Sequence, residues 1–207
     1  MELITLNNNS MAENAYLYFD PQTKNGVVID PGDNEKDIMN AVEANGIILT
    51  GILLTHGHYD HLCSANEIKA HTKAPIVCHT DEKVLLEDPQ LNLSVIFGKS
   101  LSVTPDKELA DGDEIKIGGG ILKTIHTPGH SPGGICFYAE ANGKVFTGDT
   151  LFRESIGRSD LYMGNHDQLI ASIKQKLMTL PEHVRVYPGH GFGSTVGHER
   201  VGNLFVL

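Results

Sequence analysis

The segment at residues 55–61 reads THGHYDH and carries four side chains that can bind a metal ion within six residues: His56, His58, Asp60 and His61. It ends the apolar run at residues 51–55, which is typical of a strand buried on both faces. On a helix, His56 and His58 would point about 200° apart, whereas an extended turn after a strand lets both reach one ion. Gly57 between them allows a tight bend. A chance cluster of surface histidines is a poor explanation, so we expect a metal site at the end of this strand.

Three later positions repeat this arrangement, each with a ligand-type side chain in a Gly or Pro turn after an apolar run. They are His130 in TPGH (127–130), Asp149 in TGDT (147–150) and His190 in YPGH (187–190). Pro and Gly fix the conformation of the turn, so no long flexible segment separates the strand from the ligand side chain. Each one alone has an ordinary interpretation as a turn residue. Together with the first segment they give five His and two Asp, a mixture that suits zinc, iron or manganese better than calcium or magnesium.

Outside these turns, the hydrophobic pattern alternates between strands and helices and predicts a layered fold with sheets and helices. A hairpin is predicted over 15–19 and 26–29. The predicted helices cover 34–45, a segment from about residue 60 to 69, and 165–179, the last with a capping box at Asn165 and Gln168. The other predicted strands are 51–55, 75–78, 114–117, 121–125, 134–139, 144–147 and 184–187. We expect one domain over residues 1–207.

The composition excludes several classes of protein. The net charge is −10 and no stretch concentrates Lys and Arg, so nucleic acid is not an expected partner. No apolar run approaches the roughly 20 residues that span a bilayer, and the start of the chain does not look like a signal peptide. The three cysteines, Cys63, Cys78 and Cys136, are odd in number and widely spaced. This argues against a disulfide framework and favours a reducing cytoplasm, while the oligomeric state stays open.

The pattern HxHxDH, followed by isolated His, Asp and His, resembles the metallo-β-lactamase superfamily over most of the chain, from about residue 29 to 190. The resemblance implies an α/β (α+β) fold, the αββα four-layer sandwich, with two metal ions at the edge of the sheets. It implies that Asp149 bridges the ions, that Asp60 also orients the attacking water, and that Asp30 supports the ligand loop. The implied ligands are His56, His58 and His130 for one ion, and Asp60, His61 and His190 for the other.

Within the superfamily, the sequence is most similar to the short, single-domain members of the hydroxyacylglutathione hydrolase (glyoxalase II) branch, on GRSD at 157–160 and the tail from 187 to 200. β-Lactam hydrolases typically have Cys at the position of Asp149, and nuclease branches have added domains and basic surfaces. Arg158 matches a basic glutathione-contacting residue of the family. The resemblance does not extend to the helical C-terminal domain of full-length glyoxalase II, which forms part of the glutathione pocket. Thioester hydrolysis is therefore better supported than glutathione specificity.

The resemblance implies two divalent cations, with zinc first and iron or manganese as alternatives, and a hydroxide that attacks a small-molecule thioester such as S-lactoylglutathione. Three alternatives stay open: a mononuclear iron persulfide dioxygenase, a lactonase or esterase, and a non-catalytic domain stabilised by metal. Cys63 is interpreted as a buried apolar residue. The other histidines, His79 and His126 among them, have no second ligand in a matching pattern. The irregular segment 88–110 is either a loop over the site or an exposed connection.

Overall fold

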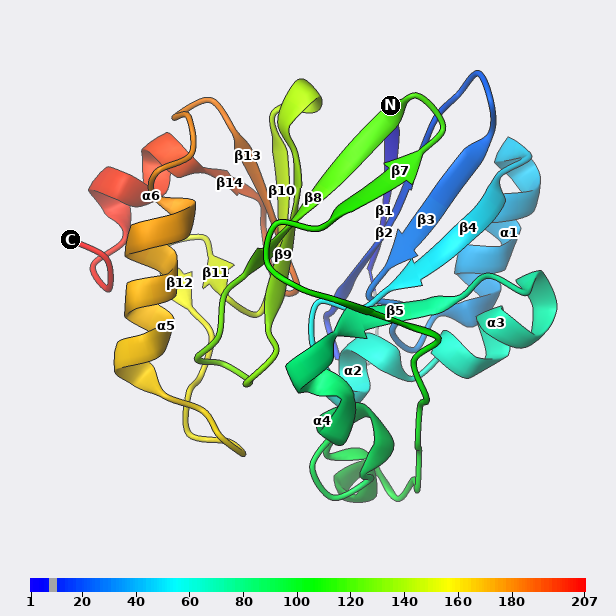
Figure 1. The fold of residues 1–207 in the computed structure, drawn as a ribbon, viewed down its shortest axis with the longest axis horizontal. Coiled ribbons are helices and arrows are strands. Elements are labelled where there is room, and N and C mark those ends of the chain that lie inside the picture. Colours follow the sequence, from blue (N-terminus) through cyan, green and yellow to red (C-terminus); the bar gives the residue numbers. More distant parts are fainter. Residues whose placement is uncertain (8–10) are drawn as a thin grey trace.

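The computed structural model describes residues 1–7 and 11–207 and contains two six-stranded sheets that face each other (Figure 1). The first sheet has the order β1-β2-β3-β4-β5-β6, antiparallel from β1 to β3 and parallel from β3 to β6. Its strands are β1 (Glu2–Asn7), β2 (Asn14–Phe19), β3 (Asn25–Ile29), β4 (Ile48–Leu53), β5 (Ile76–His79) and β6 (Lys107–Leu109).

The second sheet has the order β14-β13-β10-β9-β8-β7, and only the β10–β13 pair is parallel. Its strands are β7 (Glu114–Ile117), β8 (Gly120–His126), β9 (Ile135–Ala139), β10 (Lys144–Gly148), β13 (Arg185–Pro188) and β14 (Ser194–Thr195). A two-stranded ribbon, β11 (Leu151–Phe152) and β12 (Ser155–Ile156), lies beside it.

Helices cover the outer face of each sheet (Figure 1). The helices connected to the first sheet are α1 (Glu35–Asn45), α2 (Tyr59–Leu62), α3 (Ala65–Thr72) and α4 (Lys83–Glu87), with 3₁₀ turns η1 (Thr80–Glu82) and η2 (Ser94–Phe97). Those of the second sheet are α5 (His166–Ser172), its π-helical continuation η4 (Ile173–Leu177) and α6 (Val196–Gly202), and a further 3₁₀ turn, η3 (Glu140–Asn142), joins β9 to β10. No helix within the described ranges is long and apolar enough to cross a bilayer.

Three apolar clusters separate the four layers, because successive side chains of a strand point to opposite faces. Leu17 and Val28 of the first sheet pack under α1. Their sequence neighbours Tyr18 and Val27 lie in the central cluster, between the sheets. A third cluster, including Tyr138, joins the second sheet to α5 and η4. The expected αββα sandwich is therefore confirmed.

Most predicted elements are present, with shifted ends. The helix expected from about residue 60 to 69 is wrong in one respect, because it is two helices, α2 and α3, separated at Cys63 and Ser64. The Ser64 amide donates to Pro31 O, and its hydroxyl donates to Gly32 O, so this residue is tied to a neighbouring turn. The strand expected at 51–55 begins earlier and ends at Leu53. The segment 88–110, expected to be irregular, contains η2 and the edge strand β6.

The helix predicted at 165–179 is present as α5 and η4, and its cap is confirmed, because the Asn165 side chain accepts from the Gln168 amide at 3.0 Å. The hairpin is confirmed as the antiparallel pair β2–β3. The expectation of one domain over residues 1–207 stays a prediction.

Candidate metal centre

The seven candidate ligands follow the ends of four strands and meet at one edge of the two sheets. His56 and His58 lie in the loop after β4, and Asp60 and His61 lie on α2 directly behind it. The other three come from the second sheet, in the loops after β8, β10 and β13: His130, Asp149 and His190. The sheets pack face to face, so strand ends that are far apart in the sequence become neighbours here.

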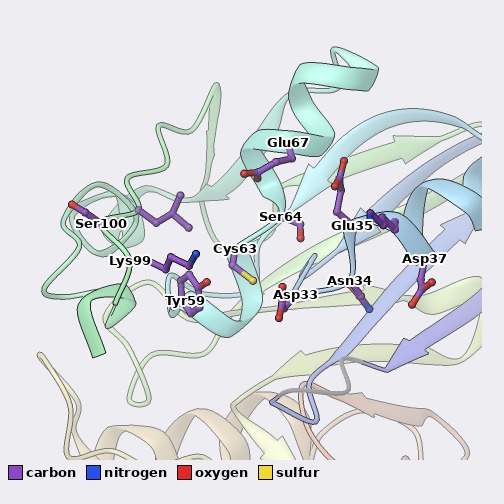
Figure 2. A pocket seen from close by; sticks show the side chains of 12 residues that line it. Asp33, Asn34, Glu35, Asp37, Tyr59, Cys63, Ser64, Glu67, Lys99 and Ser100 are labelled. Atoms are coloured by element: carbon purple, nitrogen blue, oxygen red, sulfur yellow. The ribbon is translucent and has the colours of Figure 1, made fainter. Parts of the chain in front are cut away.

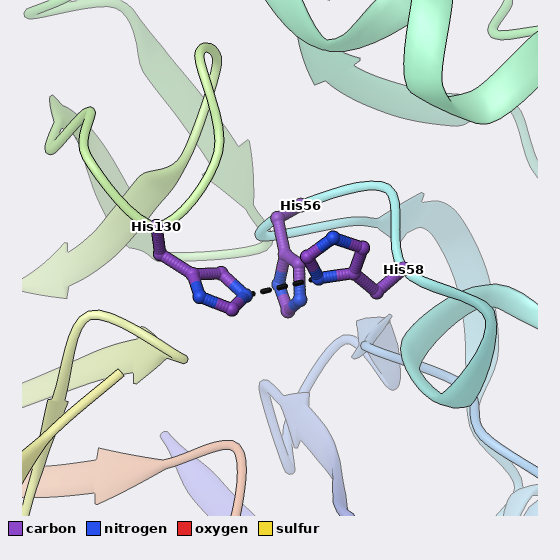
Figure 3. A group of neighbouring side chains, drawn as sticks. All are labelled: His56, His58 and His130. Carbon is purple, nitrogen blue, oxygen red and sulfur yellow. Dashed lines mark hydrogen bonds between the residues drawn. The ribbon is translucent and has the colours of Figure 1, made fainter. Parts of the chain in front are cut away.

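One group consists of three buried histidines, His56, His58 and His130 (Figure 3). His58 Nδ1 lies 2.9 Å from His130 Nε2, and one nitrogen from each of the three rings lies within 4.8 Å of the others. The rings converge from two different loops. This is the arrangement by which three imidazoles bind one ion.

The outer nitrogens of two of these rings have partners of their own. His130 Nδ1 donates to the Arg158 carbonyl at 2.7 Å, which leaves Nε2 free to face the group. The Thr55 hydroxyl donates to Asp30 and lies 3.1 Å from His56 Nδ1, so it accepts the proton of that nitrogen. His56 Nε2 is then an acceptor, buried and without a hydrogen-bond partner among the described residues. An unpaired buried acceptor is costly, and a metal ion would satisfy it.

The second group consists of Asp60, His61 and His190. His190 Nε2 lies 3.1 Å from Asp60 Oδ2 and 3.3 Å from His61 Nε2. The opposite nitrogen of His61 donates to Asp30 Oδ2 at 3.1 Å, the carboxylate–histidine pairing that orients a metal ligand. Asp30, expected from the resemblance to support the ligand loop, therefore contacts both Thr55 and His61.

Asp149 lies between the two groups. Its Oδ2 is 3.7 Å from His130 Nε2 of the first group. Its Oδ1 is 3.4 Å from His61 Nε2 and 3.7 Å from His190 Nε2 of the second group. Oδ1 is buried and has no hydrogen-bond partner within the described part of the chain. Each oxygen thus faces one group, a geometry that suits a carboxylate bridging two ions.

The pKa shifts of His56, His58 and Asp149 suit metal ligands, whereas for His61 burial is outweighed by the carboxylates of Asp149 and Asp60, which raise the pKa well above its usual value. Burial lowers the pKa of His56, and burial together with His130 lowers the pKa of His58 to about 3, so both rings are neutral. Burial alone would raise the pKa of Asp149, but the neighbouring His61, His56 and His130 lower it well below the usual value. Metal ions bind neutral imidazole and ionised carboxylate. The residues present therefore fit a pair of divalent ions, although their role as ligands stays a prediction.

Arg158, expected to contact the substrate, has two separate roles in the geometry. Its backbone carbonyl holds His130, as described above. Its side chain is exposed and makes a two-pronged ion pair with Asp160, with Nε–Oδ1 at 2.7 Å and Nη2–Oδ2 at 2.8 Å. The guanidinium is thus held in one orientation at the surface near the first group.

Two buried carboxylates near the site were not expected from the sequence. Glu82 is fully buried, and burial raises its pKa to about 7. Glu13 is also fully buried, pairs with His190 in an isolated β-bridge, and has no hydrogen-bond partner for either carboxylate oxygen within the described residues. No local pattern marks either residue as buried. Glu is ordinarily a surface residue, and only a glutamate isolated among apolar residues would suggest burial. Neither has that setting, since Glu13 precedes Asn14 and Glu82 lies between Asp81 and Lys83.

The interpretation of His79 and His126 as histidines without a second ligand is incomplete. Their rings stack at 3.9 Å with 14° between their planes, and Asp81 lies beside them. Lone pairs of imidazole lie in the ring plane, so two nearly parallel stacked rings do not direct them at one ion. This group therefore resembles a packed pair more than a metal site.

A cavity of about 640 Å³ lies beside α2 and is lined by side chains that include Tyr59, Cys63 and Lys99 (Figure 2). None of the seven candidate ligands lines it. The segment 88–110 borders it through Lys99 and packs Phe97 against Tyr59 at 4.9 Å, next to the ligand loop. Burial raises the pKa of the Cys63 thiol to about 12, so it is not a reactive thiolate.

Comparison with known proteins identifies the family that this fold and ligand arrangement define. The family model for the metallo-beta-lactamase superfamily matches residues 10–190, and the chain belongs to this superfamily. It is a superfamily of probable metallo-hydrolases whose fold binds divalent metal ions.

Among curated relatives, the chain is 38% identical to "Probable metallo-hydrolase YqgX" of Bacillus subtilis over 194 residues, 93% of this chain and 92% of that protein. It is 33% identical to "Hydroxyacylglutathione hydrolase GloC" of Haemophilus influenzae over 197 residues, 94% of this chain and 92% of that protein.

Solved structures agree with this assignment. BLEG-1 B3 metallo-beta-lactamase has a TM-score of 0.93 at 34% identity, covering 99% of both chains. TTHA1623 in a di-iron-bound form has a TM-score of 0.86 at 34% identity, covering 98% of this chain and 99% of that one. ETHE1 from Myxococcus xanthus has a TM-score of 0.84 at 27% identity, covering 99% of this chain and 84% of that one.

Proposed function

We propose that this chain is a two-metal hydrolase that cleaves a small-molecule thioester, with S-acylglutathiones such as S-lactoylglutathione as the substrate class. The observation that carries the two-metal proposal is Asp149, because its two oxygens face different ligand groups across distances of 3.4–3.7 Å. An ion held by the first group alone would leave Oδ1 of Asp149 buried without a partner.

When bound, the ions supply Lewis acidity and lower the pKa of a coordinated water to about 7. The chain's own residues prepare the site for this chemistry. Asp30 and the Arg158 carbonyl orient His61 and His130 through their outer nitrogens. Asp60 is partly exposed, so its carboxylate can both bind the ion of the second group and accept a hydrogen bond from the attacking water. A thiolate leaves without protonation by a strong acid, so no further proton donor is needed.

Two observations support a thioester of an anionic thiol. One is the 33% identity to the hydroxyacylglutathione hydrolase GloC over nearly the whole length of both proteins. The other is Arg158, whose guanidinium is exposed and oriented by Asp160 beside the first ligand group. A glutathione carboxylate can replace Asp160 as its partner, since both present the same pair of oxygens.

A second candidate is the mononuclear iron persulfide dioxygenase, which uses the same ligand types. The structural similarity to ETHE1 fits this candidate, and the di-iron form of TTHA1623 favours testing for iron. The similarity to BLEG-1 adds β-lactams to the substrates that need testing, although Asp149 stands where β-lactam hydrolases typically have Cys.

The decisive experiment combines elemental analysis of the protein as purified with activity assays on S-lactoylglutathione, a lactone, a β-lactam and glutathione persulfide. Two ions per chain with thioester cleavage and no oxygen uptake support the proposal. One iron per chain with oxygen consumption on the persulfide would establish the second candidate instead. Cleavage of none of the substrates by metal-loaded protein would favour a non-catalytic domain.

Asp149→Ala tests the bridging role directly. We expect it to lower kcat by more than about 100-fold, the upper end for loss of an outer partner of a ligand, and to lower the metal content below two ions per chain. Asp37→Ala, on the exposed face of α1, is the matched control and should change neither quantity. Normal turnover by Asp149→Ala would contradict the bridging assignment.

A further inference from the structure

Glu82 is a fully buried carboxylate that accepts three hydrogen bonds from two loops. It ends η1, after β5 of the first sheet. Its Oε1 accepts from the Gly57 amide at 2.8 Å. Its Oε2 accepts from the Gly133 amide at 2.7 Å and from the Ser131 hydroxyl at 3.0 Å. No Lys or Arg pairs with it in the described part of the chain, and the three donors lower its pKa against the larger effect of burial, which raises it.

The three donors belong to the loops that carry the three-histidine group. Gly57 separates His56 from His58, and Ser131 directly follows His130. One loop belongs to the first sheet and the other to the second, and nothing in the covalent chain fixes their separation. The Glu82 side chain spans that separation, with one oxygen on each loop.

The packing around Glu82 leaves little room for adjustment. A Cβ atom on Gly57 would lie 2.8 Å from Leu85 Cβ and 2.8 Å from Leu86 Cδ1 of α4. A Cβ atom on Gly133 would lie 2.8 Å from Glu82 Cβ. Since real Cβ atoms essentially never approach so closely, both loops rest directly on the segment 82–86. The two loops therefore fix the position of Glu82 by packing, while Glu82 joins the loops by hydrogen bonds.

We propose that Glu82 is a positioning residue for the three-histidine group: it fixes the separation of the two loops and so determines how tightly His56, His58 and His130 bind their ion. The inference rests on the proposed metal site, and it deepens it by naming the residue that sets the affinity of one group. Glu82 contacts none of the Asp60, His61 and His190 side chains through a hydrogen bond or ion pair, so we expect its effect to be selective for the first group.

Glu82→Gln is the sharpest substitution, because Gln keeps the length and shape of Glu. Its amide nitrogen must replace either Oε1, where it meets the Gly57 N–H, or Oε2, where it meets the Gly133 N–H. A donor then faces a donor at less than 3 Å in both orientations, and one loop is pushed away. The shape is retained and only the bridge between the loops is lost.

Glu199→Gln is a matched control. Glu199 is also fully buried and accepts from the Glu154 amide and the Asn203 side chain, both at 2.9 Å, and from the Ser194 hydroxyl. None of these partners adjoins the three histidines. The control therefore repeats the loss of a buried carboxylate with three donors, in a part of the molecule away from the first group.

The experiment is a titration of metal-free protein with Zn²⁺ and with Co²⁺ against a chromophoric chelator, which resolves two binding constants without any assay of activity. His130→Ala identifies which constant belongs to the three-histidine group. We expect Glu82→Gln to weaken that constant by about 10–100-fold, the usual effect of an outer partner of a ligand, and to leave the other within about threefold. In the His130→Ala background Glu82→Gln should have no further effect, and Glu199→Gln should change neither constant.

Three results would overturn the inference while leaving the proposed function intact. They are unchanged metal binding by Glu82→Gln, equal weakening of both metal-binding constants in that variant, or the same weakening of the first constant in Glu199→Gln. Conversely, selective weakening in a protein that cleaves no thioester would sustain the inference and remove the proposed substrate. If Glu82→Gln does not fold, Ser131→Ala removes a single donor, and a smaller loss confined to the same constant is then the expected result. No loss in that variant would overturn the inference.

Discussion

The orientation of individual rings decides what this site can bind. His61 and His130 each give one nitrogen to a fixed outer partner, Asp30 and the Arg158 carbonyl, and His190 Nδ1 does the same with Ala12 O at 3.2 Å. In each ring the other nitrogen is thereby directed toward the neighbouring ligands. This fixes the plane of each ring before any ion arrives, which reduces the reorganisation that binding requires.

Arg158→Ala is a test at this scale. We expect KM for S-lactoylglutathione to rise about tenfold, equivalent to about 1.4 kcal/mol and consistent with one charge-assisted hydrogen bond at an exposed position, with kcat within about twofold. The His130 contact survives because it uses the backbone carbonyl. KM for a thioester of an uncharged thiol should stay unchanged and serves as the control. An unchanged KM for both substrates would remove Arg158 as support for a glutathione substrate.

At the scale of elements, the site depends on close contact between the ligand loop and α4. The loop at Gly57 rests on Leu85 and Leu86, and a side chain at this position would meet both at 2.8 Å. Gly57 is thus needed for the packing of the loop against the helix as well as for the tight turn that the sequence predicts.

Gly57→Ala should therefore destabilise the protein by about 1–3 kcal/mol, the usual cost of overpacking. For a chain of this length, the corresponding drop in Tm is roughly 5 °C, measurable by calorimetry or circular dichroism. Gly119→Ala is the control, because its added Cβ would meet only Asp20 Oδ2 at 3.6 Å, an ordinary contact. Equal Tm values for the two variants would show that α4 can move away from the loop without cost.

At the scale of the whole molecule, the centre joins the two halves of the sandwich. His56, His58, Asp60 and His61 come from the first sheet and its loops, whereas His130, Asp149 and His190 come from the second. Each proposed ion has ligands from both halves. Metal binding should therefore stabilise the packing of one sheet against the other as well as prepare the site.

Removal of metal tests this. An ion present at 100 times its dissociation constant stabilises the folded state by about 2.7 kcal/mol, so Tm should fall by roughly 5–10 °C after chelation and recover when the ion returns. In His130→Ala the fall should be smaller, because one group has lost a ligand. Identical melting of metal-free and metal-loaded protein would mean that neither sheet depends on the ions.

The sequence by itself determined which residues stand at the strand ends, because strands and tight turns leave local patterns. The apolar runs, the Gly and Pro turns and the capped helix after Asn165 are all encoded within a few neighbouring residues. The assignment of His130, Asp149 and His190 to the two groups came only from the resemblance to a family, since no local pattern states which distant loops meet.

Only the tertiary structure decided the contacts between distant segments. The bridge from Glu82 to Gly57 and Gly133 joins residues 25 and 51 positions apart. The break between α2 and α3 likewise depends on hydrogen bonds from Ser64 to a turn about 32 residues earlier. Hydrogen-bond partners of this kind depend on how the two sheets pack, and packing is a property of the whole chain that no single segment specifies.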